Sequence, residues 1–373
     1  FKQLMMSQIQ VGMQQSIQQP LPNESEDAFE ARRAIAQQGM EDVQKMINEL
    51  ESITVGFNID QTRQSVYLDF GITAKEGTDT AKQFAYEDTT TELAGFLTDA
   101  AAVQMNLSSS FDTAQAEQIN ISLEALRSQA IDQLQNDPTI PSEELRALAI
   151  KAISTFMDVG KATLSSGKID LAGSVDLTDG FTSVVAAAVV PQAEQLDQIV
   201  RDFVKIATEQ DPSFPDVEID AQKKGDTSFH VIRMPIPEYE ADARSAFGDA
   251  VEISIGVGPD RVYIGVGKDS LKRLSAAIDA SAANKGKKVP AALLKGSMTK
   301  VLQYAAEMTQ DLSMQQAAAA AASVAGKDTA SMELSAIKNG VRFRMELEAG
   351  VLKSIQHLQG PADLTDGFDD SPF

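Results

Sequence analysis

Five segments of the chain each consist of two runs of alternating apolar and polar residues joined by turn-forming residues. In the last of them the turn is Asn339-Gly340, a dipeptide that adopts the positive φ angles of a tight hairpin turn. Strands joined by such short turns run antiparallel. The sequence therefore predicts mainly antiparallel β-sheet built from hairpins at 52–73, 168–190, 217–234, 250–267 and 329–348.

Two of these hairpins have sides of clearly different polarity. One side of the 52–73 hairpin is wholly apolar, and we expect helices to bury it. In the 329–348 hairpin, alternate residues of the second strand are charged, and we expect that side to face water. The apolar set is Ile53, Val55, Phe57, Ile59, Val66, Leu68, Phe70 and Ile72, and the charged set is Arg342, Arg344, Glu346 and Glu348.

Between the hairpins lie segments in which apolar residues recur every three or four positions, as they do on the core-facing side of an amphipathic helix. The clearest are 28–50, 114–136, 143–160 and 192–209. Hairpins and helices together predict the α+β class, with mainly antiparallel curved sheets packed against amphipathic helices.

The order of the predicted elements occurs twice along the chain, which predicts an internal duplication of two α/β halves. The best local match is between 65–71 (SVYLDFG) and 261–267 (RVYIGVG). We expect an N-terminal helix and linker at 1–23, a first half at 24–212, a second half at 213–359 and an acidic tail at 360–373.

The first residues carry an apolar stripe at helical spacing, formed by Phe1, Met5, Ile9, Met13 and Ile17 with Leu4 beside it. Methionines suit adaptable contact surfaces. Two interpretations are open: the stripe packs on its own domain, or it binds a second subunit or another partner.

Charge and composition exclude several classes of function. Lys and Arg total 32 against 54 Asp and Glu, and the net charge of -22 repels nucleic-acid phosphates. The chain has no cysteine, so it has no disulfides and no thiolate sites. No apolar run is long enough to span a bilayer.

Catalytic and cofactor patterns are also missing. No glycine-rich phosphate loop or nucleophile elbow occurs, and two Ser-x-x-Lys spacings, at Ser165 and Ser297, lack the accompanying Lys-Thr-Gly. His230 has the pattern of a packed, hydrogen-bonded strand residue, and His357 lies near a helix end. Asp-Leu-Thr-Asp-Gly-Phe occurs at both 176–181 and 363–368 and is interpreted as a turn, with cation binding left open. We expect no catalytic residues, no cofactor and no metal site.

Several short motifs resemble one family, and together they cover most of the chain: 52–57 (SITVGF), 73–78 (TAKEGT), 211–217 (DPSFPDV), 228–230 (SFH), 235–238 (PIPE), 262–268 (VYIGVGK) and 339–341 (NGV). They are similar to uncharacterised exported proteins of planctomycete-type bacteria. The resemblance implies a periplasmic, envelope or extracellular location and longer N-terminal regions, with a leader and another α/β segment. It brings no catalytic residues.

These observations favour a non-catalytic, exported structural or interaction protein that assembles with itself or with an envelope partner. The alternative is a carrier of an apolar, lipid-like ligand held between curved sheet and helices. A glycoside hydrolase using an acidic pair is a third hypothesis, but no spacing selects a pair.

Overall fold

The computed structural model describes residues 7, 26–84, 89–110, 113–140, 142–178, 180–210 and 214–358. Its main feature is one sheet of twelve strands in the order β1-β2-β14-β13-β12-β4-β5-β6-β10-β9-β8-β7, with every neighbouring pair antiparallel. The predicted α+β class and all five predicted hairpins are confirmed. The strands are β1 (Leu50–Asp60), β2 (Ser65–Ala74), β4 (Val103–Ser110), β5 (Lys168–Thr178), β6 (Phe181–Val189), β7 (Asp216–Lys224), β8 (Thr227–Pro235), β9 (Ala250–Val257), β10 (Arg261–Val266), β12 (Ala292–Ser297), β13 (Thr329–Ile337) and β14 (Gly340–Glu348).

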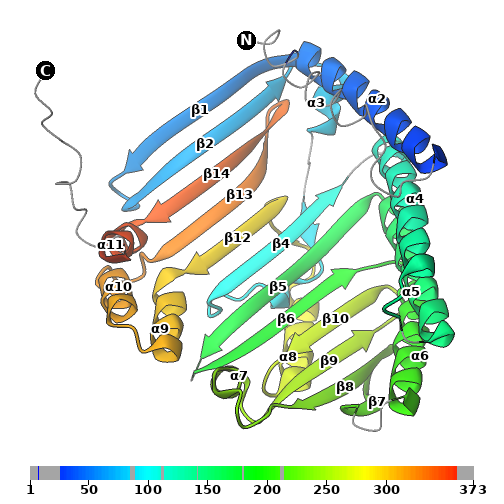
Figure 1. Ribbon diagram of the computed structural model, residues 1–373. Helices are drawn as coiled ribbons and strands as arrows, with labels where there is room; N and C mark the ends of the chain where they lie inside the picture. The colour runs from blue at the N-terminus through cyan, green and yellow to red at the C-terminus, as the bar shows by residue number, and fades with distance from the viewer. Residues whose placement is uncertain are drawn as a thin grey trace, which may run out of the picture.

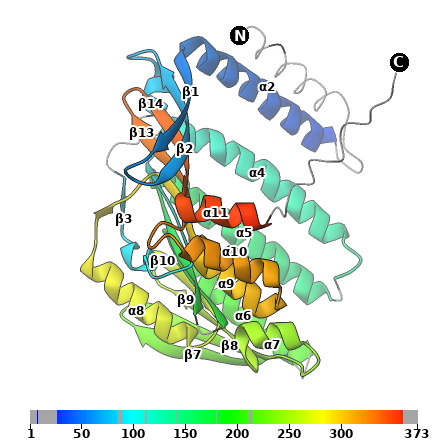
Figure 2. The same cartoon turned by 90° about the vertical axis from the view of Figure 1, so that its left-hand side faces the viewer.

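Helices lie along both ends of the strands (Figure 1). At one end are α2 (Glu26–Glu49), α4 (Thr113–Asn136), α5 (Glu143–Ser165) and α6 (Glu194–Gln210). At the other are α7 (Ala241–Phe247), α9 (Met298–Thr309), α10 (Leu312–Ala322) and α11 (Ala349–Leu358). Figure 2 shows both groups on the same side of the sheet, with α8 (Ser270–Ala283) on the opposite side. The remaining elements are α3 (Asp79–Gln83), the short helix η1 (Ala94–Phe96) and the small pair of β3 (Thr90–Thr91) with β11 (Lys287–Lys288).

A buried core lies between α8, η1 and the sheet. Tyr263 on β10 stacks between Phe96 and Phe229, with ring centroids 6.0 and 6.1 Å away. Leu274 of α8 is fully buried in the same cluster. Gly256 lies against this core, where an added Cβ would come within 2.4 Å of the Phe229 ring, so only glycine fits.

The strand order has an internal symmetry. When β1, β2, β4, β5 and β6 are matched with β9, β10, β12, β13 and β14, the order from β1 to β9 reads the same from either end. The midpoint is the β4–β12 pair, and the β8–β7 hairpin has no counterpart. Both predicted halves therefore contribute interleaved strands to one sheet. This symmetry agrees with the expected order of elements, while duplication itself stays a prediction.

Two phenylalanines on opposite faces of the sheet test which face contributes more to the free energy of unfolding. Truncating Phe229 to Ala removes a fully buried ring and should cost about 3–5 kcal/mol of unfolding free energy. Phe57→Ala removes a ring that is 69% exposed and should cost less than about 1 kcal/mol. Urea unfolding of both variants checks this, and equal midpoints would contradict the assignment of the core to the α8 side.

Candidate functional site

One face of the sheet is apolar in three adjacent rows of residues that run across the strands. In the central row, successive hydrogen-bonded strands place these residues side by side: Phe57, Leu68, Met345, Met332, Leu294, Met105, Gly173, Ala186, Ile264 and Ile255. The rows on either side are equally apolar. They run from Val55 through Phe70, Phe343 and Leu107 to Val257, and from Ile59 through Val66, Val103 and Val184 to Val217.

Eleven large side chains on this face are open to solvent. Those on β1 are 62–69% exposed and those on the inner strands 37–47%. We call this exposed set the floor, and it consists of Val55, Phe57, Ile59, Leu68, Phe70, Met105, Leu107, Ile264, Leu294, Met332 and Phe343. Single protein domains rarely expose a contiguous apolar patch of this extent, and such patches are typical of binding surfaces.

The expectation that helices bury the apolar side of the 52–73 hairpin is wrong. Val55, Phe57 and Ile59 are among the most exposed large apolar side chains of the described residues. The physical reason is the position of the helices, which lie over the strand ends and leave the middle of the strands open (Figure 1).

Two groups of helices border the floor, and we call them the first wall (α2, α4, α5 and α6) and the second wall (α7, α9, α10 and α11). Thr182, on the floor side of β6, donates a hydrogen bond of 2.6 Å to the Tyr304 hydroxyl of α9. Asp197 of α6 reaches His230, which continues the central row onto β8. Both walls therefore stand on the floor side of the sheet, as Figure 2 shows.

Beneath the floor, the opposite face of β2, β13 and β14 is polar. Arg344 donates two hydrogen bonds of 2.7 Å to Asp69, and its guanidinium lies 4.0 Å from the centre of the Tyr67 ring. These bonds hold the pKa of Asp69 below its usual range. Tyr67 corresponds to Tyr263 in the sequence match of 65–71 with 261–267. The 14-residue α8 covers Tyr263, whereas the helix that contacts β2 is the 5-residue α3.

The charged side of the 329–348 hairpin was therefore predicted incompletely. Its four charged residues are half-buried in specific contacts rather than free in water. Arg344 binds Asp69, Arg342 donates to the Ser335 hydroxyl, Glu346 accepts from the Ser65 hydroxyl and Glu348 accepts from the Thr329 N–H. The apolar side of the same hairpin, with Met332 and Phe343, is the more open one.

His230 fastens the first wall to the sheet. It is fully buried, and its Nδ1 accepts the Asp220 N–H at 3.1 Å, so Nε2 carries the proton and donates to Asp197 at 2.6 Å. Arg201 of α6 binds Asp197 and makes a bidentate pair with Asp220, at 2.7 and 2.9 Å. The prediction of a packed, hydrogen-bonded histidine is confirmed, and its role is structural.

Ser297, one of the two serines with Ser-x-x-Lys spacing, has a structural role as well. The Ser297 hydroxyl donates to Asp328 and accepts the Lys300 N–H, which makes it the N-cap of α9. Asp176, in the first copy of the repeated hexapeptide, pairs with Arg273 at 2.8 Å. The second copy lies outside the described residues. Within the described ranges no cluster of His, Asp and Glu could hold a metal ion.

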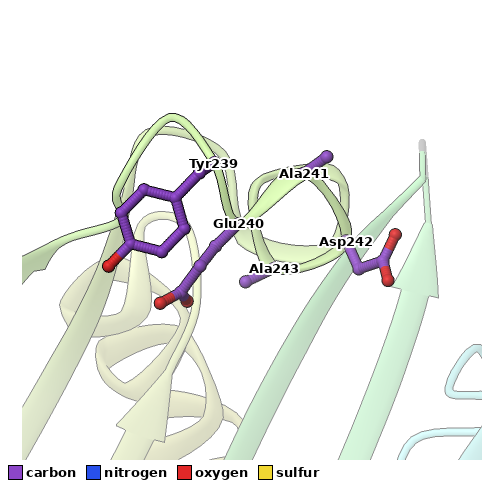
Figure 3. Close-up of a pocket in the computed structure, with 5 residues that line it drawn as sticks. All are labelled: Tyr239, Glu240, Ala241, Asp242 and Ala243. Atoms are coloured by element: carbon purple, nitrogen blue, oxygen red, sulfur yellow. The ribbon is translucent and has the colours of Figure 1, made fainter.

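A surface hollow of about 340 Å³ lies at the start of α7. Five consecutive residues line it, 239–243, and Figure 3 shows the carboxylates of Glu240 and Asp242 pointing in different directions. Since no ionisable group from another element lines this hollow, its chemistry is that of an exposed turn.

The predicted partner-binding stripe, Phe1, Leu4, Met5, Ile9, Met13 and Ile17, lies outside the described residues. Sequence reasoning missed the inner floor on β4 and β12, including Met105, Leu107 and Leu294. Their alternation was visible, but the runs are short.

None of the helices in the described part of the chain is long and apolar enough to cross a membrane. Comparisons with models of protein families, with curated proteins and with solved structures found no match.

The Arg201 pair predicts a pH dependence. Arg201 lowers the pKa of Asp220 to about 2 from an ordinary value of 3.8. Because the folded-state pKa is lowered, the pair stabilises the protein above about pH 4, and this contribution is lost as pH falls towards 2. Arg201→Gln should raise the pKa of Asp220 towards its ordinary value, as followed by carboxyl NMR, and should lower the urea midpoint at pH 7 more than at pH 2.

The matched control is Arg63→Gln, because the exposed Arg63 side chain lies 3.7 Å from the Asp60 carboxylate and this long ion pair should contribute little. An Asp220 titration that is the same in the wild type and in Arg201→Gln would contradict the assignment.

Proposed function

We propose that this protein is a non-catalytic carrier that holds an extended apolar ligand, of the acyl-chain class, on the floor between the two walls. The observation that carries the proposal is the exposure of a continuous apolar sheet face bordered by helices on both sides. Methionines at three positions of the central row, Met105, Met332 and Met345, suit ligands of variable shape.

The size of the floor fits chains better than compact molecules. With strands about 4.8 Å apart, the rows from β1 to β9 extend over about 40 Å. Each methylene removed from water contributes about 0.8 kcal/mol, so about ten seated methylenes give about 8 kcal/mol. Association costs of about 4–15 kcal/mol offset at least half of that gain and can exceed it. A ligand with two or more chains is therefore favoured over a single fatty acid.

The net charge of the chain restricts the head group of the proposed ligand. The chain carries a net charge of -22, which disfavours anionic head groups at close range. A neutral or zwitterionic head group fits this constraint. Export to the envelope or exterior, which the family resemblance implies, is part of the proposal, because a carrier of such ligands would work between membranes or at their surface.

The proposal is tested by extraction of the purified protein and mass spectrometry of the extract, followed by titration with a fluorescent two-chain zwitterionic lipid. We expect co-purified or bound lipid. The double variant Met105→Glu/Leu294→Glu places two carboxylates side by side at the floor centre and should weaken binding about tenfold or more, since a charge is costly against hydrocarbon.

Gln37→Glu/Gln222→Glu is the matched control, because it adds the same two charges at exposed glutamines outside the floor. It should bind lipid as the wild type does. Both floor positions are already more than 45% exposed, so the floor variant should fold normally. Equal binding by the two variants, or none by the wild type, would refute the carrier.

A further inference from the structure

The twelve-stranded sheet has two edges, β1 and β7, and they differ in kind. β7 has the features that protect natural edges: the register shifts between Glu218 and Gln222, Asp220 has a φ of 55°, and charged residues occur along the strand. Such an edge is poorly suited to pair with another strand.

β1 lacks those features. From Ser52 to Ile59 it contains no charged residue and no proline, and its register with β2 is continuous from Ser52 to Asp60. Among the described residues no strand pairs with its outer side. An edge strand that is long, regular and uncharged is a template for one more antiparallel strand.

The symmetry of the sheet indicates that a further strand pairs with the outer side of β1. β9, the counterpart of β1, is not an edge, because β8 pairs along it with Ile255 opposite His230. The β8–β7 hairpin has no counterpart beside β1 in the described chain. The higher exposure of Val55, Phe57 and Ile59, at 62–69% against 37–47% for the inner floor, agrees with a missing neighbour.

We propose that β1 pairs antiparallel with β1 of a second copy of the chain. A two-fold axis perpendicular to the sheet keeps the apolar residues of both copies on one side, so the two floors join into one surface. The paired segments carry no charge, so pairing brings no like charges together despite the acidity of the whole chain. This inference rests on the strand edge and stands independently of ligand binding.

The test is the native mass of the full chain, measured by analytical ultracentrifugation over a range of concentrations. We expect twice the mass of the 373-residue chain at high concentration. Thr54→Lys/Asn58→Lys changes two exposed residues on the side of β1 away from the floor. In a dimer centred on Gly56, each new lysine lies opposite one in the partner copy, so the dissociation constant should rise about tenfold or more.

Two comparisons separate this proposal from the carrier. Gln37→Lys/Gln222→Lys adds the same charges away from β1 and should leave the dimer intact, as should the floor variant Met105→Glu/Leu294→Glu. The lysine pair on β1 should still bind lipid at the monomer floor. Hydrogen exchange of the β1 amides should slow as concentration rises.

A single-copy mass at every concentration would overturn the β1 dimer. So would a dimer unchanged by Thr54→Lys/Asn58→Lys, or one lost only in the floor variant, which would place self-association on the floor.

Discussion

The rest of this structure depends on a mismatch between the apolar face of the sheet and the helices available to cover it. Twelve strands present continuous apolar rows, while the helices on that side stand over the strand ends. A face of this kind is normally buried, because leaving it in water forfeits about 25 cal/mol for each Å² of apolar surface. That energy is instead available to a bound partner.

Stability comes chiefly from other parts of the molecule. The opposite face has its own core around Tyr263, Phe229 and Leu274, which α8 covers. Within the sheet, every strand except β1 and β7 is hydrogen-bonded to a neighbouring strand on both sides. At β2 and β14 the same face carries the Asp69–Arg344 pair, with the Arg344 guanidinium over the Tyr67 ring. The His230 cluster attaches α6 of the first wall to the sheet without using any residue of the floor.

The proposed carrier and the proposed dimer use different parts of one surface. The symmetric midpoint of the sheet lies at the β4–β12 pair, in the centre of the floor, whereas self-association uses the uncharged edge at β1. Joining two copies at β1 extends the floor without covering it. The two proposals are therefore compatible, and a joined floor would favour ligands with several chains more strongly.

The sequence by itself determined the local elements of this protein. Asn339-Gly340 marks a hairpin turn, the helical spacings mark α4, α5 and α6, and the alternation in Val55, Phe57 and Ile59 shows that these residues share a face. Alternation says which side chains point the same way, but not what lies opposite them. Burial of that face, the join of β2 to β14, and the difference between the β1 and β7 edges depend on contacts between segments far apart in the chain, so only the tertiary structure decided them.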